Sequence, residues 1–463
     1  MSAYLSKIKM ASEKHPLITG SFLLTLAGFI SRLIGFFYRM FLSQQFGEEG
    51  MGIYQLISPV MALSFSLTAA GFQTSISKFV AEYTGRHQDA SGYSKDYQPF
   101  LLGLSISLPL SIGIMLFVQT YSSWIATSFL QEPRTAPLLR ILALSLPLSA
   151  VHACINGYFY GRKKAVVPAV CQLVEQLARV LSVYFLCHSI LLQGQIPSLT
   201  ITVTGILIGE IVSTLLCILA LLHTIVEKAP LSPTATTNKL SIDKGITYGM
   251  LLSMAIPLIA NRITLNLLQS IETVSLPARL RMYGYDPSTA LSVYGVLTGM
   301  AFPLLFFPNA LTSAIAVMLL PLISERSSAG DREGIRKLTA KTIRYCSLLG
   351  FSCLLIFLLF GERLGILLFH SPLAGLFIRA LSFMCPFLYL NSTLSAILQG
   401  LGKVITLFFI NVSSLLVRLA FILFLVPIYG IQGYLWGLLA GQLLQSIWYL
   451  FILNHTSKKR PLS

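Results

Sequence analysis

Eight arginines of this sequence lie within or near the ends of long apolar stretches, where a permanent positive charge is costly, and five of them are candidate binding residues. Arg32 and Arg39 are seven residues apart, so on a helix they share one face. Arg179, Arg262 and Arg418 lie in three other stretches. A guanidinium keeps its charge and binds phosphate through a fork of N–H donors. Such a set is typical of a site for an anion, and a pyrophosphate head group fits it.

One of these arginines begins a polar stripe. Arg262, Asn266, Gln269 and Glu272 follow one another at steps of four, three and three residues. Residues at these spacings lie on the same side of a helix. The stripe therefore predicts a polar face on a helix that is otherwise apolar, and we interpret it as part of the wall of a substrate cavity.

Acidic residues in the apolar stretches can balance this positive charge. Glu175 precedes Arg179 by four residues, the spacing of an ion pair on a helix, so the two form a structural pair or line a cavity. Glu210 and Glu272 are candidate counter-charges or coupling groups for a cation. His152 has no clear acid or nucleophile partner in the sequence, so we expect a packed histidine, with no catalytic residues and no metal ion.

The composition shows which elements must position these residues. The chain has 463 residues, of which 55% are hydrophobic and only 11% are charged, and its mean hydropathy is +0.75. Average soluble domains carry about 25% charged residues. This composition excludes a cytosolic enzyme, a nucleic-acid-binding domain and a disordered chain. It indicates an all-α polytopic membrane protein that needs no cofactor.

Twelve apolar stretches are long enough to cross a bilayer, since a spanning helix needs about 20 mainly apolar residues. The predicted spans are 17–42, 52–80, 99–121, 137–160, 165–190, 199–226, 246–275, 289–323, 340–361, 374–399, 403–426 and 432–454. The first is too long for a cleavable signal peptide. All seven cysteines fall in apolar segments without a Cys-x-x-Cys pair, so we expect small buried side chains and no metal or disulfide.

The loops predict the orientation of the chain. With the N-terminus inside, the cytoplasmic loops hold 20 lysines and arginines, and the outer loops hold 4. Such an excess marks the cytoplasmic side. The outer four are Arg134, Arg279, Arg281 and Arg363. We therefore expect a multi-pass protein of the cell membrane with both termini in the cytoplasm.

The second half of the sequence repeats the first. Gly161, Lys164 and Arg179 are matched 239 residues later by Gly400, Lys403 and Arg418. Weaker matches are Tyr54 with Tyr294, Glu82 with Glu325, and Gly209–Glu210 with Gly441–Gln442. The repeat predicts two six-helix lobes around a central cavity, 1–226 and 245–463, joined by a cytoplasmic linker at 227–244. Six is an even number, so the lobes share one orientation in the membrane.

Seven segments in order along the chain resemble a known family. They are SRLIGFFYR at 31–39, GEEGMGIYQ at 47–55, ISKFVAE at 76–82, QLVEQLARV at 172–180, YGVLTGMAFP at 294–303, LPLISE at 320–325 and ILQGLGK at 397–403. The chain resembles the multidrug/oligosaccharidyl-lipid/polysaccharide flippase superfamily. Within it, the chain is most similar to the stage V sporulation protein B group, which is related to lipid II flippases.

The resemblance implies a flippase and no enzyme activity. It implies that undecaprenyl-pyrophosphate-linked saccharides move outward by alternating access, with Arg32 and Arg39 matching the cavity arginines of the first span. The expected partners are the lipid-linked saccharide, membrane lipids and the enzymes of wall or polysaccharide synthesis, with no nucleic acid. Two alternatives stay open: a cation-coupled multidrug or metabolite antiporter, and a non-transporting scaffold for wall synthesis.

Overall fold

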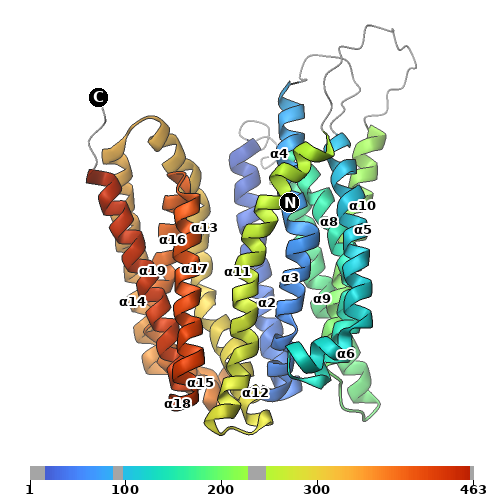
Figure 1. The fold of residues 1–463 in the computed structure, drawn as a ribbon, viewed down its shortest axis with the longest axis vertical. Helices are drawn as coiled ribbons and strands as arrows, with labels where there is room; N and C mark the ends of the chain where they lie inside the picture. The colour runs from blue at the N-terminus through green and yellow to red at the C-terminus, as the bar shows by residue number, and fades with distance from the viewer. Residues whose placement is uncertain (1–15, 87–96, 228–246, 459–463) are drawn as a thin grey trace, which may run out of the picture. The chain divides into compact units, whose positions relative to one another are not determined.

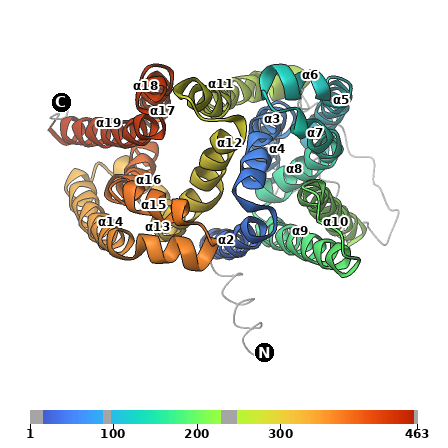
Figure 2. The same cartoon turned by 90° about the horizontal axis from the view of Figure 1, so that it is seen from below.

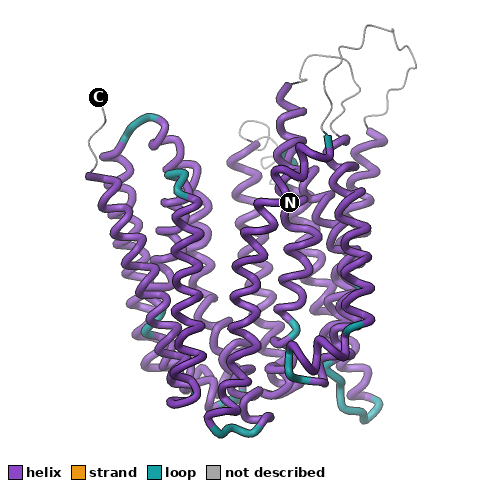
Figure 3. Tube along the Cα trace, in the orientation of Figure 1, coloured by secondary structure: helices purple, strands orange, loops and turns teal. Residues whose placement is uncertain are grey.

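The computed structural model describes residues 16–86, 97–227 and 247–458, and within these ranges the chain is helical with no strand (Figures 1 and 3). By length and composition, nine helical stretches of these ranges are suited to cross a membrane, or eleven if each of two bent helix pairs counts as one span. All seven cysteines are buried, as predicted. The all-α polytopic fold is thereby confirmed.

Chain contacts divide the protein into two compact units. Unit 1 holds the described parts of Met1–Ser31, Val60–Thr127 and Ala136–Asn266, and unit 2 holds those of Arg32–Pro59, Ser128–Thr135 and Leu267–Ser463. The boundary falls inside two long helices, α2 (Pro16–Leu56) and α11 (Tyr248–Tyr283). The predicted linker at 227–244 lies, apart from its first residue, outside the described residues. The two six-helix lobes therefore stay a prediction.

The helices of the first half follow the predicted spans closely. They are α2 (Pro16–Leu56), α3 (Ser58–Phe65), η1 (Ser66–Ala70), α4 (Gly71–Arg86), α5 (Gln98–Thr120), α6 (Ser122–Trp124), η3 (Ile125–Phe129), η4 (Pro133–Thr135), α7 (Ala136–Ala143), α8 (Ser145–Gly161), α9 (Val166–Leu192) and α10 (Thr200–Glu227).

The helices of the second half lie at the predicted spans, and α11 and α14 extend up to eight residues beyond theirs. They are α11 (Tyr248–Tyr283), α12 (Pro287–Gly295), η5 (Val296–Ala301), α13 (Phe302–Ser328), α14 (Arg332–Phe369), α15 (Pro372–Ser382), α16 (Cys385–Gly400), α17 (Val404–Ala420), η6 (Phe421–Leu425), α18 (Val426–Tyr429) and α19 (Ile431–Lys458).

The first two predicted spans share one helical stretch, Leu23–Thr84, which explains why fewer than twelve separate spans are found. Gly47 breaks α2 with a φ of +67° and a ψ of −173°. A residue with a Cβ is strained at this positive φ, so glycine suits the turn. The stretch therefore contains two helical segments, one on each side of Gly47, at the places of the two predicted spans.

Glycine contacts repeat between the two halves of the chain. In unit 1, a Cβ on Gly161 of α8 would lie 2.6 Å from the carbonyl oxygen of Ser77 and from Val80 on α4. In unit 2, a Cβ on Gly400 of α16 would lie 2.8 Å from the carbonyl oxygen of Leu320 on α13. Gly400 is the repeat equivalent of Gly161. Leu320 is the repeat equivalent of Ser77, because the two are separated by the same number of residues as Glu82 and Glu325. The repeat is thus present in the packing of these helix pairs.

The two hydrophobic cores are also built from equivalent positions. The core of unit 1 contains Ile76, Val80, Ile155, Tyr158, Phe159, Cys171 and Cys217. The core of unit 2 contains, in the same order, their repeat equivalents Leu319, Ile323, Leu394, Ile397, Leu398, Ile410 and Tyr449. Viewed along the helices, α8 lies beside α4 and α10, and α16 lies beside α13 and α19 (Figure 2).

Candidate functional site

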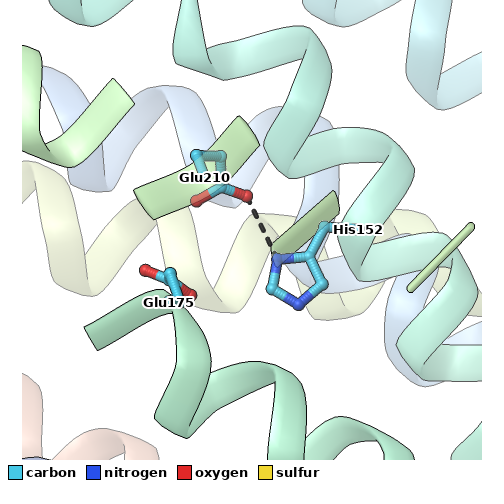
Figure 4. Close-up of side chains that lie close together, drawn as sticks. All are labelled: His152, Glu175 and Glu210. Atoms are coloured by element: carbon cyan, nitrogen blue, oxygen red, sulfur yellow. Dashed lines mark hydrogen bonds and ion pairs between the residues drawn. The ribbon is translucent and has the colours of Figure 1, made fainter. Parts of the chain in front are cut away.

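Three helices of unit 1 bring an imidazole and two carboxylates together. His152 comes from α8, Glu175 from α9 and Glu210 from α10, and their ligand atoms lie within 4.8 Å of one another (Figure 4). His152 and Glu210 are buried, with 9% and 7% of their surface exposed, and Glu175 is partly buried. An ionisable cluster inside an apolar helix bundle is costly, so each of its members needs a partner.

Hydrogen bonds give every member a partner. Nδ1 of His152 lies 3.1 Å from Oε1 of Glu210, and Nε2 lies 3.3 Å from the hydroxyl of Ser213 on α10. An ionised carboxylate only accepts, so Nδ1 is the donor toward Glu210. The guanidinium of Arg179 donates to Glu175 one helical turn away, as the spacing predicted. The cluster therefore contains two pairs, His152 with Glu210 and Arg179 with Glu175.

Gly209 lets the two pairs approach each other. A Cβ on this residue would lie 2.9 Å from the backbone oxygen of Glu175 and 3.2 Å from Cβ of Arg179. Because glycine lacks that atom, α10 lies directly against α9, and the neighbouring Glu210 comes close to Glu175. This contact explains why the carboxylates of two separate helices belong to one cluster.

Unit 2 holds an uncharged counterpart of the His152–Glu210 pair. In the repeat, Asn391 takes the place of His152, and Gln442 takes the place of Glu210. The amide of Asn391 donates to the side-chain and backbone oxygens of Gln442, both at 2.9 Å. The hydroxyl of Ser446 donates to Oδ1 of Asn391 at 2.7 Å. The same contact between equivalent helices is therefore ionisable in unit 1 and neutral in unit 2.

A second charged cluster lies in unit 2. Nε of Arg418 on α17 donates to Oε1 of Glu272 on α11 at 2.9 Å, and the hydroxyl of Tyr434 on α19 donates to the same oxygen at 2.7 Å. Glu272 and Tyr434 are buried, with 5% and 3% exposed. Gly441 makes room for the arginine, since a Cβ there would lie 3.0 Å from its side-chain carbons. Glu272 thus neutralises Arg418.

The members of the predicted polar stripe on α11 differ in their partners and exposure. Asn266 donates to the backbone oxygen of Ala62 at 3.2 Å and to the hydroxyl of Ser66 at 2.6 Å, and all three belong to unit 1. Glu272 binds Arg418 in unit 2 instead. Arg262 and Gln269, on the same helix, are exposed.

The arginines fall into two groups. Arg179 and Arg418 are paired with carboxylates, whereas Arg32 and Arg262 are exposed and form no ion pair with the described residues. Arg39, on α2 with Arg32, is partly buried. Whether these arginines share one cavity stays a prediction, as do the roles of all ten candidate residues in binding or coupling.

Sequence reasoning missed the partner of His152. The expectation of a histidine without an acid partner is wrong, because Glu210 lies far along the chain and reaches it only through the packing of α8 against α10. It also missed Ser213 and Tyr434. The repeat aligns His152 with Asn391 and Glu210 with Gln442, so a contact seen in one half predicts its equivalent in the other, but the sequence alone shows neither contact.

Comparisons with known proteins agree with this architecture. A family model described as polysaccharide biosynthesis protein matches residues 17–327, and one described as MatE matches residues 257–424. Stage V sporulation protein B of Bacillus subtilis (strain 168) is 27% identical over 94% of this chain and 83% of its own length. Lipid II flippase MurJ of the same organism is 24% identical over 84% and 73%, respectively.

A solved structure shows the same fold. Lipid II flippase MurJ in its inward closed conformation aligns with 94% of this chain and 87% of its own, with a TM-score of 0.68 and 15% sequence identity. The polysaccharide biosynthesis model covers well over half of the sequence. The chain therefore belongs to the polysaccharide biosynthesis protein family, within the multidrug/oligosaccharidyl-lipid/polysaccharide flippase superfamily of membrane transporters and flippases.

Proposed function

We propose that this protein moves an anionic polyprenyl-pyrophosphate-linked saccharide from the inner to the outer leaflet of the cell membrane. In this proposal, two six-helix lobes at 1–226 and 245–463 alternate around a central cavity, and both chain termini lie in the cytoplasm. The cavity captures the head group from the cytoplasmic leaflet while the polyprenyl tail stays in lipid. Rocking of the lobes then exposes the head group on the outer side.

One observation carries the proposal: Arg32 and Arg262 expose guanidinium groups without a carboxylate partner among the described residues. Each lies near the middle of a long apolar helix, α2 or α11. A charge at the centre of a bilayer costs about 2.5–3.5 kcal/mol on insertion scales. An anionic ligand would offset this cost, and a pyrophosphate matches the fork of guanidinium donors.

The relatives support an anionic lipid-linked substrate. One is named a lipid II flippase and another a stage V sporulation protein, and the family model is described by polysaccharide biosynthesis. Outward movement of negative charge follows an inside-negative membrane potential, which supplies about 2.3 kcal/mol per charge per 100 mV. A membrane potential alone can therefore drive this transport.

The test is outward flipping in reconstituted vesicles. The purified protein would be incorporated with a fluorescent polyprenyl-pyrophosphate-linked disaccharide, and arrival in the outer leaflet would be followed by chemical quenching. We expect Arg32→Ala and Arg262→Ala to slow flipping by about ten- to a hundredfold, since a hydrogen bond to a charged group contributes about 1.5–3 kcal/mol. Arg32→Lys should retain part of the rate.

Arg379→Ala is the matched control. This arginine is also exposed and lies on the apolar helix α15, but Glu362 already pairs with it. The control should flip at the wild-type rate when reconstituted at equal protein density. If the two alanine variants also flip normally, the unpaired arginines do not bind the head group and the proposal fails.

The alternative function is a cation-coupled antiporter for drugs or metabolites. The MatE model matches residues 257–424, and the buried pair of His152 and Glu210 offers a titratable group inside the bundle. Expression in a drug-sensitive bacterial host separates the two functions. Drug resistance that depends on Arg32 little and on Glu210 strongly would favour the antiporter.

A further inference from the structure

The charge balance of the cluster in unit 1 depends on one proton. Arg179 and Glu175 neutralise each other. Glu210 faces His152, so this pair is neutral when the imidazole is protonated and carries one negative charge when it is not. Both side chains are buried in an apolar bundle, where an uncompensated charge is costly. The packing thus favours a protonated imidazole whenever a proton can reach it.

Ser213 stabilises both protonation states of His152. Its hydroxyl lies 3.3 Å from Nε2 and also 3.3 Å from the backbone oxygen of Cys171. When Nε2 carries a proton, the hydroxyl accepts from it and donates to Cys171. When Nε2 has none, the hydroxyl rotates and donates to Nε2. The imidazole can therefore gain or lose a proton at Nε2 without leaving a hydrogen bond unmade on the ring.

The repeat shows that packing alone does not require an ionisable pair here. The equivalent positions of unit 2 hold Asn391 and Gln442, which are joined by hydrogen bonds between the same two helices. An amide pair avoids the cost of buried charge. The presence of a histidine and a glutamate in unit 1, at a position where a neutral pair suffices, points to a role for the ionisation itself.

A proton fits this site better than a divalent metal ion. With a divalent ion, Glu175, Glu210 and Arg179 would leave a net charge of +1 beside the guanidinium, whereas one proton leaves the cluster neutral. Glu175 is already bound by Arg179, and both nitrogens of His152 have hydrogen-bond partners. A metal would have to break these contacts, while a proton uses them.

We propose that His152 and Glu210 form a proton-binding site that couples transport to the proton gradient. The proton enters from water and binds Nε2 of the imidazole, and the resulting imidazolium is held by the Glu210 carboxylate at Nδ1. The other ionisable groups that face it within the described residues are Glu175, with its partner Arg179, and the thiol of Cys171. The coupling part of this proposal rests on the proposed function, but the binding part does not.

The first experiment measures proton binding directly, without any substrate. The full chain in lipid nanodiscs would be titrated between pH 8.5 and pH 5.5, and proton uptake would be compared between wild type and the double variant His152→Asn/Glu210→Gln. This variant copies the amide pair of unit 2 into unit 1. We expect wild type to take up about one proton per chain more than the double variant does, because imidazole is the side chain whose charge ordinarily changes between pH 8.5 and pH 5.5.

Two controls keep the result interpretable. Thermal unfolding must show that the double variant is folded. We expect it to fold, because the same amide pair, Asn391 and Gln442, packs between the equivalent helices of unit 2. Titration with Zn²⁺ and with Na⁺ at constant pH tests the competing ligands. The proposal is overturned if wild type and the double variant take up the same number of protons. It is also overturned if Zn²⁺ or Na⁺ binds wild type but not the double variant and leaves the proton uptake of wild type unchanged.

The second experiment measures coupling in vesicles. An imposed pH gradient should change the flipping rate of wild type by severalfold and leave the double variant insensitive, with Ser213→Ala intermediate. A gradient effect that survives in the double variant overturns the coupling role. Failure of the proposed function would look different: no protein would flip the lipid-linked saccharide, while the difference in proton uptake would remain.

Discussion

At the scale of single residues, the distinctive feature of this protein is how differently its membrane arginines are treated. Arg179 and Arg418 each have a carboxylate partner, whereas Arg32 and Arg262 have none within the described ranges. The charge of a paired arginine is neutralised within the fold and adds little attraction for a ligand, although Nε of Arg179 is buried without a hydrogen-bond partner among the described residues. The charge of an unpaired arginine stays available to attract an anionic ligand. The two groups of arginines therefore need separate tests.

The buried pair of Arg418 and Glu272 should matter for stability. Replacing Glu272 by Gln leaves the guanidinium without its counter-charge, while the amide oxygen can still accept from Tyr434. Breaking a buried pair from one side costs about 3–5 kcal/mol, whereas replacing both members by apolar groups can be neutral. We therefore expect Glu272→Gln to lower the melting temperature markedly, and Glu272→Leu/Arg418→Met to lower it much less. Thermal unfolding in nanodiscs measures both. Equal loss in the two variants would contradict this account.

At the scale of helices, glycines set which pairs pack most closely. Gly157 and Gly161 on α8 face the backbone of α4, and Gly400 on α16 faces that of α13. Gly209 and Gly441 bring α10 and α19 against the arginine-bearing helices α9 and α17. In a bilayer, where no hydrophobic force drives helices together, small residues that permit close contact are a main source of association.

A pair of glycine variants tests this. A Cβ on Gly157 would lie 2.6 Å from the backbone oxygen of Gln73, whereas a Cβ on Gly113, inside α5, meets nothing within 4 Å. We expect Gly157→Ala to destabilise the protein by about 1–3 kcal/mol, the usual cost of overpacking. Gly113→Ala should be neutral or stabilising by up to about 1 kcal/mol, since alanine favours a helix. Chemical unfolding would measure the free energy of unfolding of both variants. If both lose similar amounts relative to wild type, the α4–α8 contact is not tight.

The helices themselves were predictable, and the reason is physical. A bilayer forces the backbone to satisfy its own hydrogen bonds, so an apolar stretch of sufficient length has few alternatives to a helix. The predicted spans accordingly coincide with observed helices, although α11 and α14 extend up to eight residues beyond their predicted spans and two spans near Gly47 share one helical stretch.

The contacts of the site were harder to predict. Pairing within one helix, as for Glu175 and Arg179, follows from spacing alone. Pairing between helices, as for His152 and Glu210, depends on which helices are neighbours and how each is rotated. The sequence does not give this information, and the repeat only transfers a contact known in one half to the equivalent helices of the other. Glu272 and Arg418 have no such equivalent contact, because the position equivalent to Arg418 in the first half, Arg179, pairs with a glutamate of its own helix instead.

At the scale of the whole molecule, the repeat explains both the similarity and the difference between the halves. Equivalent glycines and core residues give the helix bundles of the two halves the same internal packing. On this common framework the first half carries the ionisable pair of His152 and Glu210, and the second half carries the amides of Asn391 and Gln442. If the lobes alternate around a cavity, such an asymmetry gives the first of them an ionisable pair at a position where the second has a neutral one.

The orientation of the chain in the membrane is the remaining prediction at this scale. Helix α9 has 27 residues, about 40 Å at 1.5 Å per residue, which is longer than the roughly 30 Å hydrocarbon core. The loops before and after it, at Lys163 and Gln195, must then lie on opposite sides. Because positive loops stay inside, we expect Lys163→Cys to resist a membrane-impermeant maleimide in intact cells and Gln195→Cys to react. The buried native cysteines should give little background, and lysed cells supply the control in which both sites react. The reverse labelling pattern would place the termini outside, and outward flipping would then require that the arginines meet the substrate from the other leaflet.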